Sequence, residues 1–433
     1  MAQFDKDFLL GAATAAHQVE GNNIHSDCWA QEQMKHSSYA EPSLDAVDHY
    51  HHYEEDIRLL ADAGLNAYRF SVEWARIEPE EGIFDEKELE HYSRVIDCCI
   101  SNSVEPVVTL HHFSSPVWLI RKGGWEAKTT PEDFSRYVRV VMEHLGSRLH
   151  YVCTINEANM GIQVAAISRR YILQMRANAA MEEKKGVVQT GDGAVQLGVN
   201  LESMMQSRRL AADENKEIFG TQEPQCFTSP RTPEGDLLVM KAHQAARAVI
   251  RELCPQVKVG VTLSLHDIQA VDGGEERAGK EWEEEFLHYL TYIAEDDFLG
   301  VQNYTRSLIG PGGQLPVPQK AELTQMNYEF YPEALEHVIR RVAEDYHGEL
   351  IVTENGIATA DDERRVEFIR RATEGLVRCR ADGIPVRGYF YWSLLDNFEW
   401  QKGFSMTFGL IAVDRSTQIR KPKESLSMLG KMR

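Results

Sequence analysis

Two glutamates end short apolar runs at distant places in the chain, and such a pair of carboxyls could do acid–base or nucleophilic chemistry. Glu157 follows the run 151–156, and Glu354 follows the run 350–353. β-Branched runs that end in Asn-Glu or Glu-Asn are typical of buried strands whose last residues emerge at a sheet edge. Burying a carboxylate costs free energy unless it is paired or takes part in chemistry. The sequence therefore predicts a pair of carboxyls with an acid, base or nucleophile role if the two strand ends meet.

The elements that must bring these strand ends together alternate along the chain. Apolar or β-branched runs occupy residues 8–16, 67–72, 106–111, 152–155, 257–265, 298–303, 350–353 and 386–395. Charged segments with helical periodicity occupy residues 45–63, 85–102, 131–148, 236–252, 332–346 and 361–381. Strands separated by helices in this way predict an α/β fold, a (β/α)8 TIM barrel that forms a single domain over residues 1–433. In such barrels the C-terminal strand ends and the following loops form the active face.

Two intervals break this alternation. Residues 158–235 form a long stretch after the fourth apolar run, with a helical piece at 165–185. We expect this stretch to be an elaborated loop on the active face of the barrel. The Gly- and Pro-rich residues 310–319 predict a plain loop.

The predicted strand ends carry polar and aromatic side chains of several kinds. Carboxylates, amides, imidazoles, an arginine and tryptophans are all present, at Gln18, Glu20, Arg69, Glu73, His111, His112, Asn156, Glu157, Gln302, Asn303, Tyr304, Glu354, Asn355, Trp392, Glu399 and Trp400. This mixture suits a sugar, because amides and carboxylates bind vicinal hydroxyls and indole rings stack on the C–H face of a pyranose. The sequence does not predict a Gly-rich phosphate loop, since Gly191-Asp192-Gly193 alone is too weak a signal.

The composition disfavours several classes of partner. The 433 residues include 46 basic and 67 acidic ones, and the net charge of −21 argues against nucleic acid or an anionic membrane surface. Residues 1–10 do not resemble a signal peptide, and an apolar stretch long enough to span a membrane is not found. Seven scattered cysteines fit a reduced, cytoplasmic protein better than a disulfide framework. The sequence indicates no oligomeric state.

Two groups of histidines could suggest a metal. His111 and His112 are adjacent on a strand and should point to opposite faces, so they cannot readily share one ion. The group at residues 49–55 lies on a helix with an apolar period, which favours a solvated helix face. We therefore predict no metal and no cofactor.

Four strings of residues resemble glycoside hydrolase family 1, the β-glucosidase family, and the resemblance runs over nearly the whole chain. They are TINEAN at 154–159, VTENG at 352–356, AYRFSVEWARIEP at 67–79 and YWSLLDNFEW at 391–400. The resemblance implies a retaining, two-step mechanism, for which the two carboxyls must lie about 5 Å apart. Glu157 matches the general acid/base of the family and Glu354 the nucleophile. Arg69 matches the arginine that keeps the nucleophile ionised, and Tyr304 matches a tyrosine that donates a hydrogen bond to it.

The same resemblance implies a set of sugar-binding residues, at Gln18, His112, Asn156, Gln302, Trp392, Glu399, Trp400 and Phe408. Relatives that act on 6-phosphorylated sugars place serine where Glu399 stands, and lysine and tyrosine where Met406 and Phe408 stand. A carboxylate at Glu399 would repel a phosphate dianion, so an unphosphorylated sugar is favoured.

Several positions depart from the family pattern. Ala158 replaces the usual proline after the acid/base, Phe113 replaces a tryptophan, and Thr407 replaces a common arginine. If Tyr304 matches the family tyrosine, Gln302 stands where the family has an asparagine. Shifting the match by one residue would instead place Asn303 at the asparagine position. These departures affect the expected preference for the leaving group, and leave the catalytic atoms in place.

We therefore expect a β-glucosidase that hydrolyses terminal β-D-glucosyl residues from oligosaccharides or from aryl and alkyl glucosides. Side activity on galactosides or fucosides and transglycosylation are variants of this expectation. One alternative is a sugar-binding barrel that has lost catalysis. Another is a magnesium-dependent barrel lyase, for which the sequence lacks an evident acidic metal triad.

Overall fold

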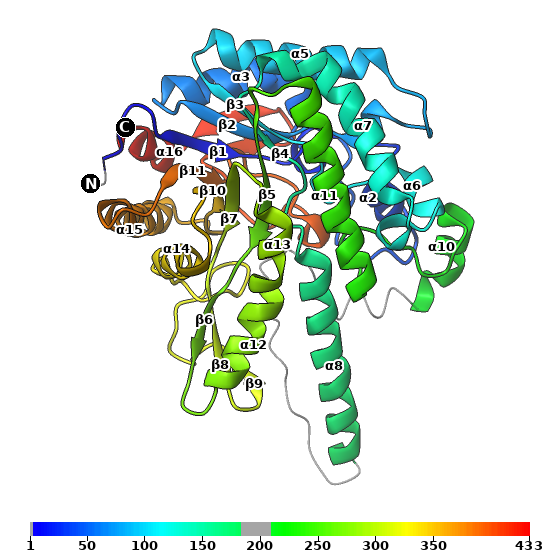
Figure 1. Ribbon diagram of the computed structural model, residues 1–433, viewed down its shortest axis with the longest axis vertical. Coiled ribbons are helices and arrows are strands. Elements are labelled where there is room, and N and C mark those ends of the chain that lie inside the picture. Colours follow the sequence, from blue (N-terminus) through cyan, green and yellow to red (C-terminus); the bar gives the residue numbers. More distant parts are fainter. Residues whose placement is uncertain (1–2, 183–208) are drawn as a thin grey trace.

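The computed structural model describes residues 3–182 and 209–433. Its centre is a closed barrel in which the strand order is β1-β11-β10-β7-β5-β4-β3-β2, and every neighbouring pair is parallel (Figure 1). The strands are β1 Leu9–Ala13, β2 Ala67–Ser71, β3 Glu105–Thr109, β4 Tyr151–Cys153, β5 Lys258–Ser264, β7 Phe298–Gln302, β10 Glu349–Asn355 and β11 Val386–Trp392. All eight predicted runs contribute one strand each, so the predicted (β/α)8 TIM barrel is confirmed.

The strands are buried on both faces, which explains why their sequences are continuous apolar runs rather than alternating ones. All five residues of β7 are buried, as are those of β1 and β2. Helices cover the outside of the barrel, and inward side chains fill its interior. The polar residues at the strand ends therefore emerge together on one face.

Long helices surround the barrel, and each of the six predicted helices is present (Figure 1). They are α3 His49–Asp62, α5 Glu86–Ser101, α7 Thr130–Leu145, α11 Pro233–Leu253, α14 Ala334–Asp345 and α15 Asp362–Ala381. Several begin at side-chain caps: Asp85 Oδ1 accepts from Lys87 N at 2.9 Å, and Asp361 Oδ1 accepts from Glu363 N at 3.0 Å. Such caps satisfy backbone N–H groups that lack a partner in the first turn.

Shorter helices connect these elements. They are α1 Ala16–Val19, α2 Asp27–Glu32, α4 Trp74–Ile77, α6 Val117–Arg121, η1 Gly124–Glu126, η2 Gly146–Arg148, α10 Ala212–Phe219, η3 Leu287–Tyr289, α13 Leu290–Ile293, η4 Trp400–Lys402 and α16 Glu424–Gly430. A hairpin of β12 Ile411–Asp414 and β13 Ile419–Pro422 precedes α16. In the described part of the chain, no helix is long and apolar enough to cross a membrane.

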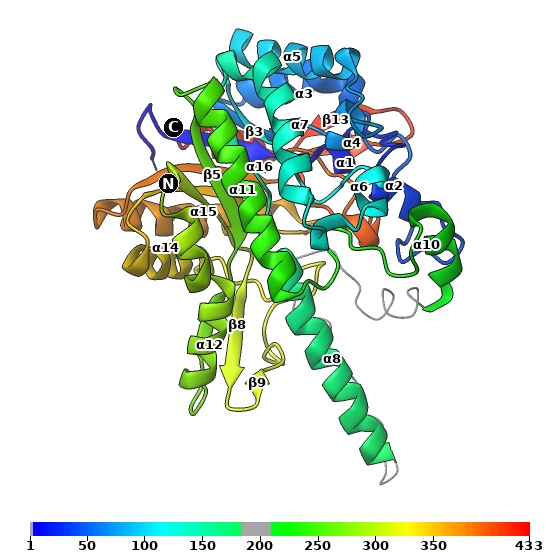
Figure 2. The ribbon, with the colours of Figure 1, turned by 45° about the vertical axis from the view of Figure 1, so that its right-hand side comes forward.

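A flank of the molecule extends away from the barrel beside the active face (Figures 1 and 2). It consists of the long helix α8 Met160–Glu182, helix α12 Glu275–Glu285, and a small sheet of β6 Asp267–Ala270, β8 Arg306–Gly310 and β9 Gly313–Gln314. The predicted helical piece after the fourth strand is confirmed and begins earlier than expected. Residues 183–208 of the same interval lie outside the described residues.

One expectation for this flank is wrong, and one of its helices was not anticipated. The stretch 310–319 is not a plain loop, because residues 313–314 form β9 and pair with β8 in a tight hairpin. Helix α12 was not predicted; only Ala278 and Trp282 on it are buried, and two apolar contacts are too few to show a helical period in a charged segment.

Candidate active site

Three donors, one on β2 and two at the end of β7, hold the carboxylate of Glu354, near the end of β10. Arg69 Nη1, on β2, donates to Oε1 at 2.6 Å. Gln302 Nε2, the last residue of β7, donates to the same oxygen at 3.0 Å, and the Tyr304 hydroxyl donates to Oε2 at 2.6 Å. The arginine is fully buried. Charge-assisted hydrogen bonds to both oxygens stabilise the ionised form of this carboxyl and fix its orientation.

The amide of Asn156 connects the arginine to the sugar-binding candidates. Asn156 Oδ1 accepts from Arg69 Nη2 at 2.5 Å and from Gln302 Nε2 at 2.7 Å. Its amide nitrogen lies 3.1 Å from His112 Nε2. The side chain of Asn303 turns away, toward the carbonyl oxygens of Leu265 and Thr305. It is therefore Gln302 that contacts Glu354, in agreement with the register that assigns Tyr304 as the tyrosine.

Glu157 follows β4 in a sharp turn that β5 holds in place. Its φ of 44° lies in the left-handed region, and its N–H donates to Thr262 Oγ1 at 2.8 Å. The N–H of Ala158 donates to the carbonyl oxygen of Thr262 at 3.0 Å. A proline at position 158 would lack this N–H. The alanine that replaces the usual family proline therefore adds a backbone hydrogen bond to β5.

Arg231 supports the other side of the same turn. Its guanidinium is almost fully buried and donates from Nη1 to the carbonyl oxygen of Ala158 at 3.2 Å, and from Nη2 to that of Phe227 at 2.5 Å. The side chain passes so close to Gly161 that a Cβ there would lie 2.5 Å from the guanidinium carbon. Sequence reasoning missed this residue, because an arginine in a turn-rich segment carries no periodic signal.

The two glutamates differ in their electrostatic surroundings. Burial raises the pKa of Glu157 well above its usual range, and the negative charge of Glu354 raises it further. Burial also raises the pKa of Glu354, but Arg69, Tyr304 and Gln302 all favour its ionised form. We therefore expect Glu354 to ionise first and Glu157 to keep its proton to higher pH.

Gln18 and Glu399 lie side by side at the edge of this group. Gln18 Nε2 donates to Glu399 Oε2 at 3.2 Å and to the carbonyl oxygen of Phe398 at 2.8 Å. Burial, with a smaller effect from the charge of Glu354, raises the pKa of Glu399 to about 8. The neutral form of this carboxyl, which can donate as well as accept hydrogen bonds, therefore persists to higher pH than in an ordinary glutamate. The expected repulsion of a phosphate by an ionised Glu399 is weaker than the sequence suggested.

Aromatic rings complete the arrangement. His112 stacks on Trp392, with ring centroids 5.6 Å apart, and on Trp400, with centroids 6.1 Å apart. Phe408 packs edge-on against Tyr304 at 6.2 Å. All these residues are buried. Hydrogen bonds, ring contacts and the turn at Thr262 thus join ten of the twelve residues that the sequence singled out, and the Gln18–Glu399 pair adjoins them because Trp400 follows Glu399 in the chain.

Further residues contribute to the group, although the sequence analysis assigned no role to them individually. Tyr328 and Met326, which follow β9, pack in one apolar cluster with Tyr304 and Trp392. Asn159 fastens the start of α8 to the end of β5, because its side chain exchanges hydrogen bonds of 2.8 and 3.0 Å with the backbone of Ser264. These contacts come from segments far apart in the sequence, so only the folded chain reveals them.

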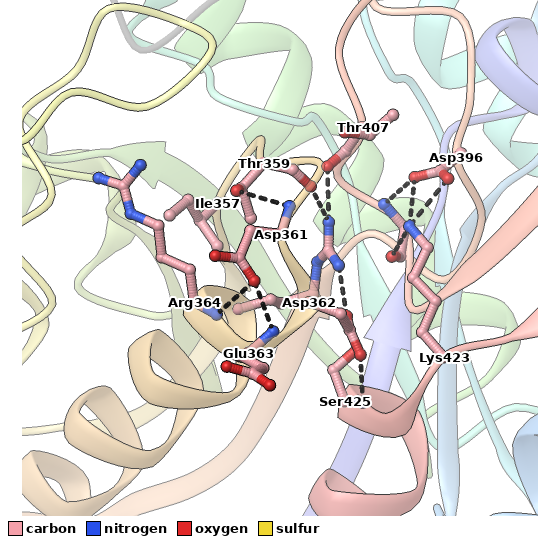
Figure 3. A network of polar contacts seen from close by, with 12 residues as sticks. Ile357, Thr359, Asp361, Asp362, Glu363, Arg364, Asp396, Thr407, Lys423 and Ser425 are labelled. Atoms are coloured by element: carbon pink, nitrogen blue, oxygen red, sulfur yellow. Dashed lines mark hydrogen bonds and ion pairs between the residues drawn. The ribbon is translucent and has the colours of Figure 1, made fainter.

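A polar network joins the loop after β10 to the chain that leads to the C-terminus (Figure 3). Arg365 Nη2 donates to the carbonyl oxygens of Thr359 at 2.5 Å and Thr407 at 2.8 Å. Lys423 Nζ donates to the two carboxylate oxygens of Asp396 at 2.8 and 2.9 Å. These contacts fix the backbone on either side of the loops that carry the sugar-binding candidates.

The histidines have no shared ligand geometry. Within the described residues, no group of three or more His, Cys, Asp or Glu side chains is arranged to hold a metal ion. His111 turns away from His112 and contacts Ser115 at 3.0 Å. The prediction of a solvated face at 49–55 is wrong for His49, which is buried between Asp56 at 2.7 Å and the Tyr68 hydroxyl at 3.0 Å.

Comparisons with known proteins agree with this geometry. The profile of glycosyl hydrolase family 1 matches residues 1–180 and 310–432. The crystal structure of the β-glycosidase BGL167 is 44% identical, with a TM-score of 0.85 over 99% of this chain and 96% of that chain. A β-glucosidase of Agrobacterium sp. (strain ATCC 21400) is 31% identical over 98% of this chain and 94% of its own length. A 1,4-β-D-glucan glucohydrolase of Thermotoga neapolitana is 28% identical over 98% and 97%. The chain therefore belongs to glycosyl hydrolase family 1 and is a β-glycosidase.

Proposed function

We propose that the protein is a retaining β-glucosidase, a single-domain barrel that removes terminal, unphosphorylated β-D-glucosyl residues. The unequal surroundings of the two carboxyls support this proposal most strongly. Glu354 receives three hydrogen bonds that favour its ionised form, whereas burial and a neighbouring charge keep Glu157 protonated. A nucleophile and a proton donor need these opposite states at the same pH.

In the first step a carboxylate oxygen of Glu354 attacks the anomeric carbon as the bond to the leaving oxygen breaks. Glu157 gives its proton to that oxygen, and a covalent glucosyl ester forms on Glu354. Esterification removes the negative charge of Glu354, so the pKa of Glu157 falls and the group becomes a base. In the second step Glu157 takes a proton from water, whose oxygen displaces Glu354. A sugar or alcohol hydroxyl that replaces water gives transglycosylation.

For the sugar itself, the hydroxyls would bind Gln18, Asn156, His112 and Glu399, and the indole rings would stack on its C–H face. Among the hydrogen bonds and ion pairs of the described residues, none joins Glu399 to a cation. A phosphate dianion placed there would be buried without a counter-charge, which costs free energy whether or not Glu399 is ionised. We therefore assign an unphosphorylated glucosyl group.

Assays with p-nitrophenyl β-D-glucoside, its 6-phosphate and EDTA test this proposal. We expect turnover of the glucoside that EDTA does not change, and at least 100-fold lower kcat/KM for the phosphorylated form, on the order of the cost of an unpaired buried charge. Sugar binding without turnover by folded protein would instead support the inactive sugar-binding barrel. Loss of activity with EDTA would support the metal-dependent lyase.

The activity should depend on pH through both carboxyls. We expect kcat/KM to rise with pH as Glu354 loses its proton and to fall as Glu157 loses its own. The apparent pKa of this fall on the alkaline side of the pH profile, the falling limb, should lie well above the usual range of a carboxyl. Glu399 has a raised pKa too and needs a control. The falling limb should vanish in Glu157→Ala and persist in Glu399→Gln. The reverse pattern would assign the limb to Glu399.

Replacing Arg231 by methionine should impair proton donation by Glu157. The loss of the hydrogen bond to the Ala158 carbonyl loosens the turn that positions Glu157, so we expect about ten-fold lower kcat/KM for methyl β-D-glucoside. Dinitrophenyl β-D-glucoside, whose leaving group needs no proton, should be unaffected, and Arg231→Lys should recover part of the loss. Equal losses for both substrates would show a general structural role instead.

A further inference from the structure

Glu73 is a buried carboxyl at the active face that neither step of the proposed mechanism uses. It follows β2 and is 3% exposed. Its Oε2 accepts a hydrogen bond from the Ser114 hydroxyl at 2.6 Å, and its Oε1 accepts from the N–H of Ala75 at 3.2 Å. The carboxyl therefore connects the end of β2 to the turn that comes after β3.

That turn, at residues 112–115, has a conformation that depends on its surroundings. Phe113 has a φ of 68°, in the left-handed region that residues other than glycine rarely adopt. Such a backbone persists only where neighbouring groups hold it in place. The N–H of Ser115 donates to Asp27 Oδ1 at 2.8 Å, and the hydrogen bond to Glu73 supplies a second contact of this kind.

The turn carries two rings of the candidate site. His112 Nε2 lies 3.1 Å from the amide nitrogen of Asn156, and its ring stacks on Trp392 and Trp400. Phe113 packs against Trp400 with ring centroids 5.2 Å apart. A shift of the turn would therefore move His112 and the indole rings on which the sugar is proposed to stack.

The hydrogen bond between Glu73 and Ser114 depends on the charge of the carboxyl. An ionised carboxylate accepts a stronger hydrogen bond than a neutral carboxyl does. Protonation would also place a hydrogen on one of two oxygens that already accept from Ser114 and Ala75. The ionised form of Glu73 therefore holds the turn more firmly.

The carboxyl of Glu73 changes its charge near neutral pH. Burial raises the pKa of Glu73 to about 7, although the hydrogen bond from Ser114 opposes this rise. The charge of a protonated His17 also lowers this pKa, and the charge of Glu20 raises it. The charged or titratable side chains around Glu73 are His17, Glu20, Arg76, Tyr92 and Tyr137.

His17 and Glu20 are the neighbours whose own titration must be separated from that of Glu73. Burial raises the pKa of Glu20. Burial lowers the pKa of His17, but its contact with Glu32 at 2.6 Å outweighs this and raises the pKa overall. His112 itself stays neutral, because burial holds its pKa well below the usual range. A comparison of two forms of the protein that differ at Glu73 alone cancels these contributions.

We propose that Glu73 is a positioning residue of the site: through Ser114, its carboxylate holds the turn that presents His112 to the sugar. This inference rests on the proposed β-glucosidase function, because it uses the assignment of His112 to sugar binding. It adds that sugar binding weakens as the pH falls and Glu73 takes up a proton.

Glu73→Gln tests the role of the charge, because the amide oxygen can still accept from Ser114 and the side chain does not titrate. A suitable ligand is p-nitrophenyl 1-thio-β-D-glucoside, whose sulfur link resists hydrolysis and which carries no titratable group. Titration calorimetry gives its Kd. From about pH 8 to about pH 6, we expect the ratio of the Kd of the unmodified protein to that of Glu73→Gln to rise about three- to ten-fold, the contribution of one hydrogen bond. A ratio that does not change with pH would overturn the proposal.

Ser114→Ala tests the route independently, since it removes the donor and leaves Glu73 in place. The ratio of the Kd of the unmodified protein to that of Ser114→Ala should rise by the same factor over the same range, and a constant ratio would contradict the proposal. Glu78→Gln is the matched control, because Glu78 is a buried carboxyl that accepts from Trp74 Nε1 at 2.8 Å instead of from the turn. Its Kd should follow that of the unmodified protein at each pH.

The same preparations separate this proposal from the proposed function. Absence of turnover of p-nitrophenyl β-D-glucoside by the unmodified protein would refute the β-glucosidase function. Turnover together with constant Kd ratios would refute the role of Glu73 alone. A Glu78→Gln variant that behaves like Glu73→Gln would also refute it, because the effect would then follow from the loss of any buried carboxyl in this region.

Discussion

Replacing Glu354 by glycine is expected to lower kcat for p-nitrophenyl β-D-glucoside on the order of 10⁵-fold. The substitution removes the atom that forms the covalent intermediate, and such losses are typical of nucleophile variants. It also leaves space below the anomeric carbon, beside Arg69 and Tyr304, which hold the carboxylate in the intact protein. Azide or formate should enter this space, attack the sugar and restore turnover. One displacement inverts the configuration, so azide should yield the α-glucosyl azide.

Glu354→Gln is the matched control for this rescue. Its amide fills the same space and cannot attack, so we expect the variant to be as inactive as the glycine variant and insensitive to azide. Circular dichroism would show that both variants fold. Substantial activity of Glu354→Gly without added anions, or no response to azide in folded protein, would remove Glu354 from its proposed role.

Replacing Glu157 by alanine should produce a loss that depends on the leaving group. Alkyl glucosides need a proton on the departing oxygen, so their kcat/KM should fall about 10³-fold, within the range for general acid catalysis. Dinitrophenyl β-D-glucoside has a good leaving group and should form the intermediate at nearly the normal rate. Its breakdown then lacks a base, and the intermediate should accumulate. Steady-state and burst kinetics on the two substrates measure both effects.

Azide distinguishes the two carboxyls by the anomer that it produces. In Glu157→Ala it replaces water in the second displacement, so two inversions give the β-glucosyl azide. In Glu354→Gly the same anion gives the α-anomer. Proton NMR of the isolated products would show the difference. The same anomer from both variants would contradict the assignment of separate roles.

The barrel and the central residues of the site are predictable from the sequence because they follow from strand positions. Glu354, Arg69 and Gln302 lie in or at the ends of β10, β2 and β7, and parallel closure brings these ends to one face. The family strings then indicate which carboxyl is which. Long apolar runs and amphipathic helices are the features that a single sequence shows most clearly.

The remaining parts of the site depend on contacts that local patterns do not encode. Thr262 and Arg231 hold the turn at Glu157 from segments far along the chain, and neither stands out by type or spacing. The pKa of Glu399 depends on how deeply the folded chain buries it. For His49, the helical period predicted a solvated face. The period could not show that Asp56 and Tyr68 lie beside His49 in the folded chain and bury it.

Trapping of the covalent intermediate tests the central claim most directly. A dinitrophenyl 2-fluoro-β-glucoside should trap the intermediate, because the fluorine slows both its formation and its breakdown, whereas the good leaving group restores the rate of formation alone. Mass spectrometry of the digested protein should then find the fluoroglucosyl group on the peptide that contains Glu354, and on Glu354 itself. A label on Glu157, or full turnover without any covalent label, would contradict the account.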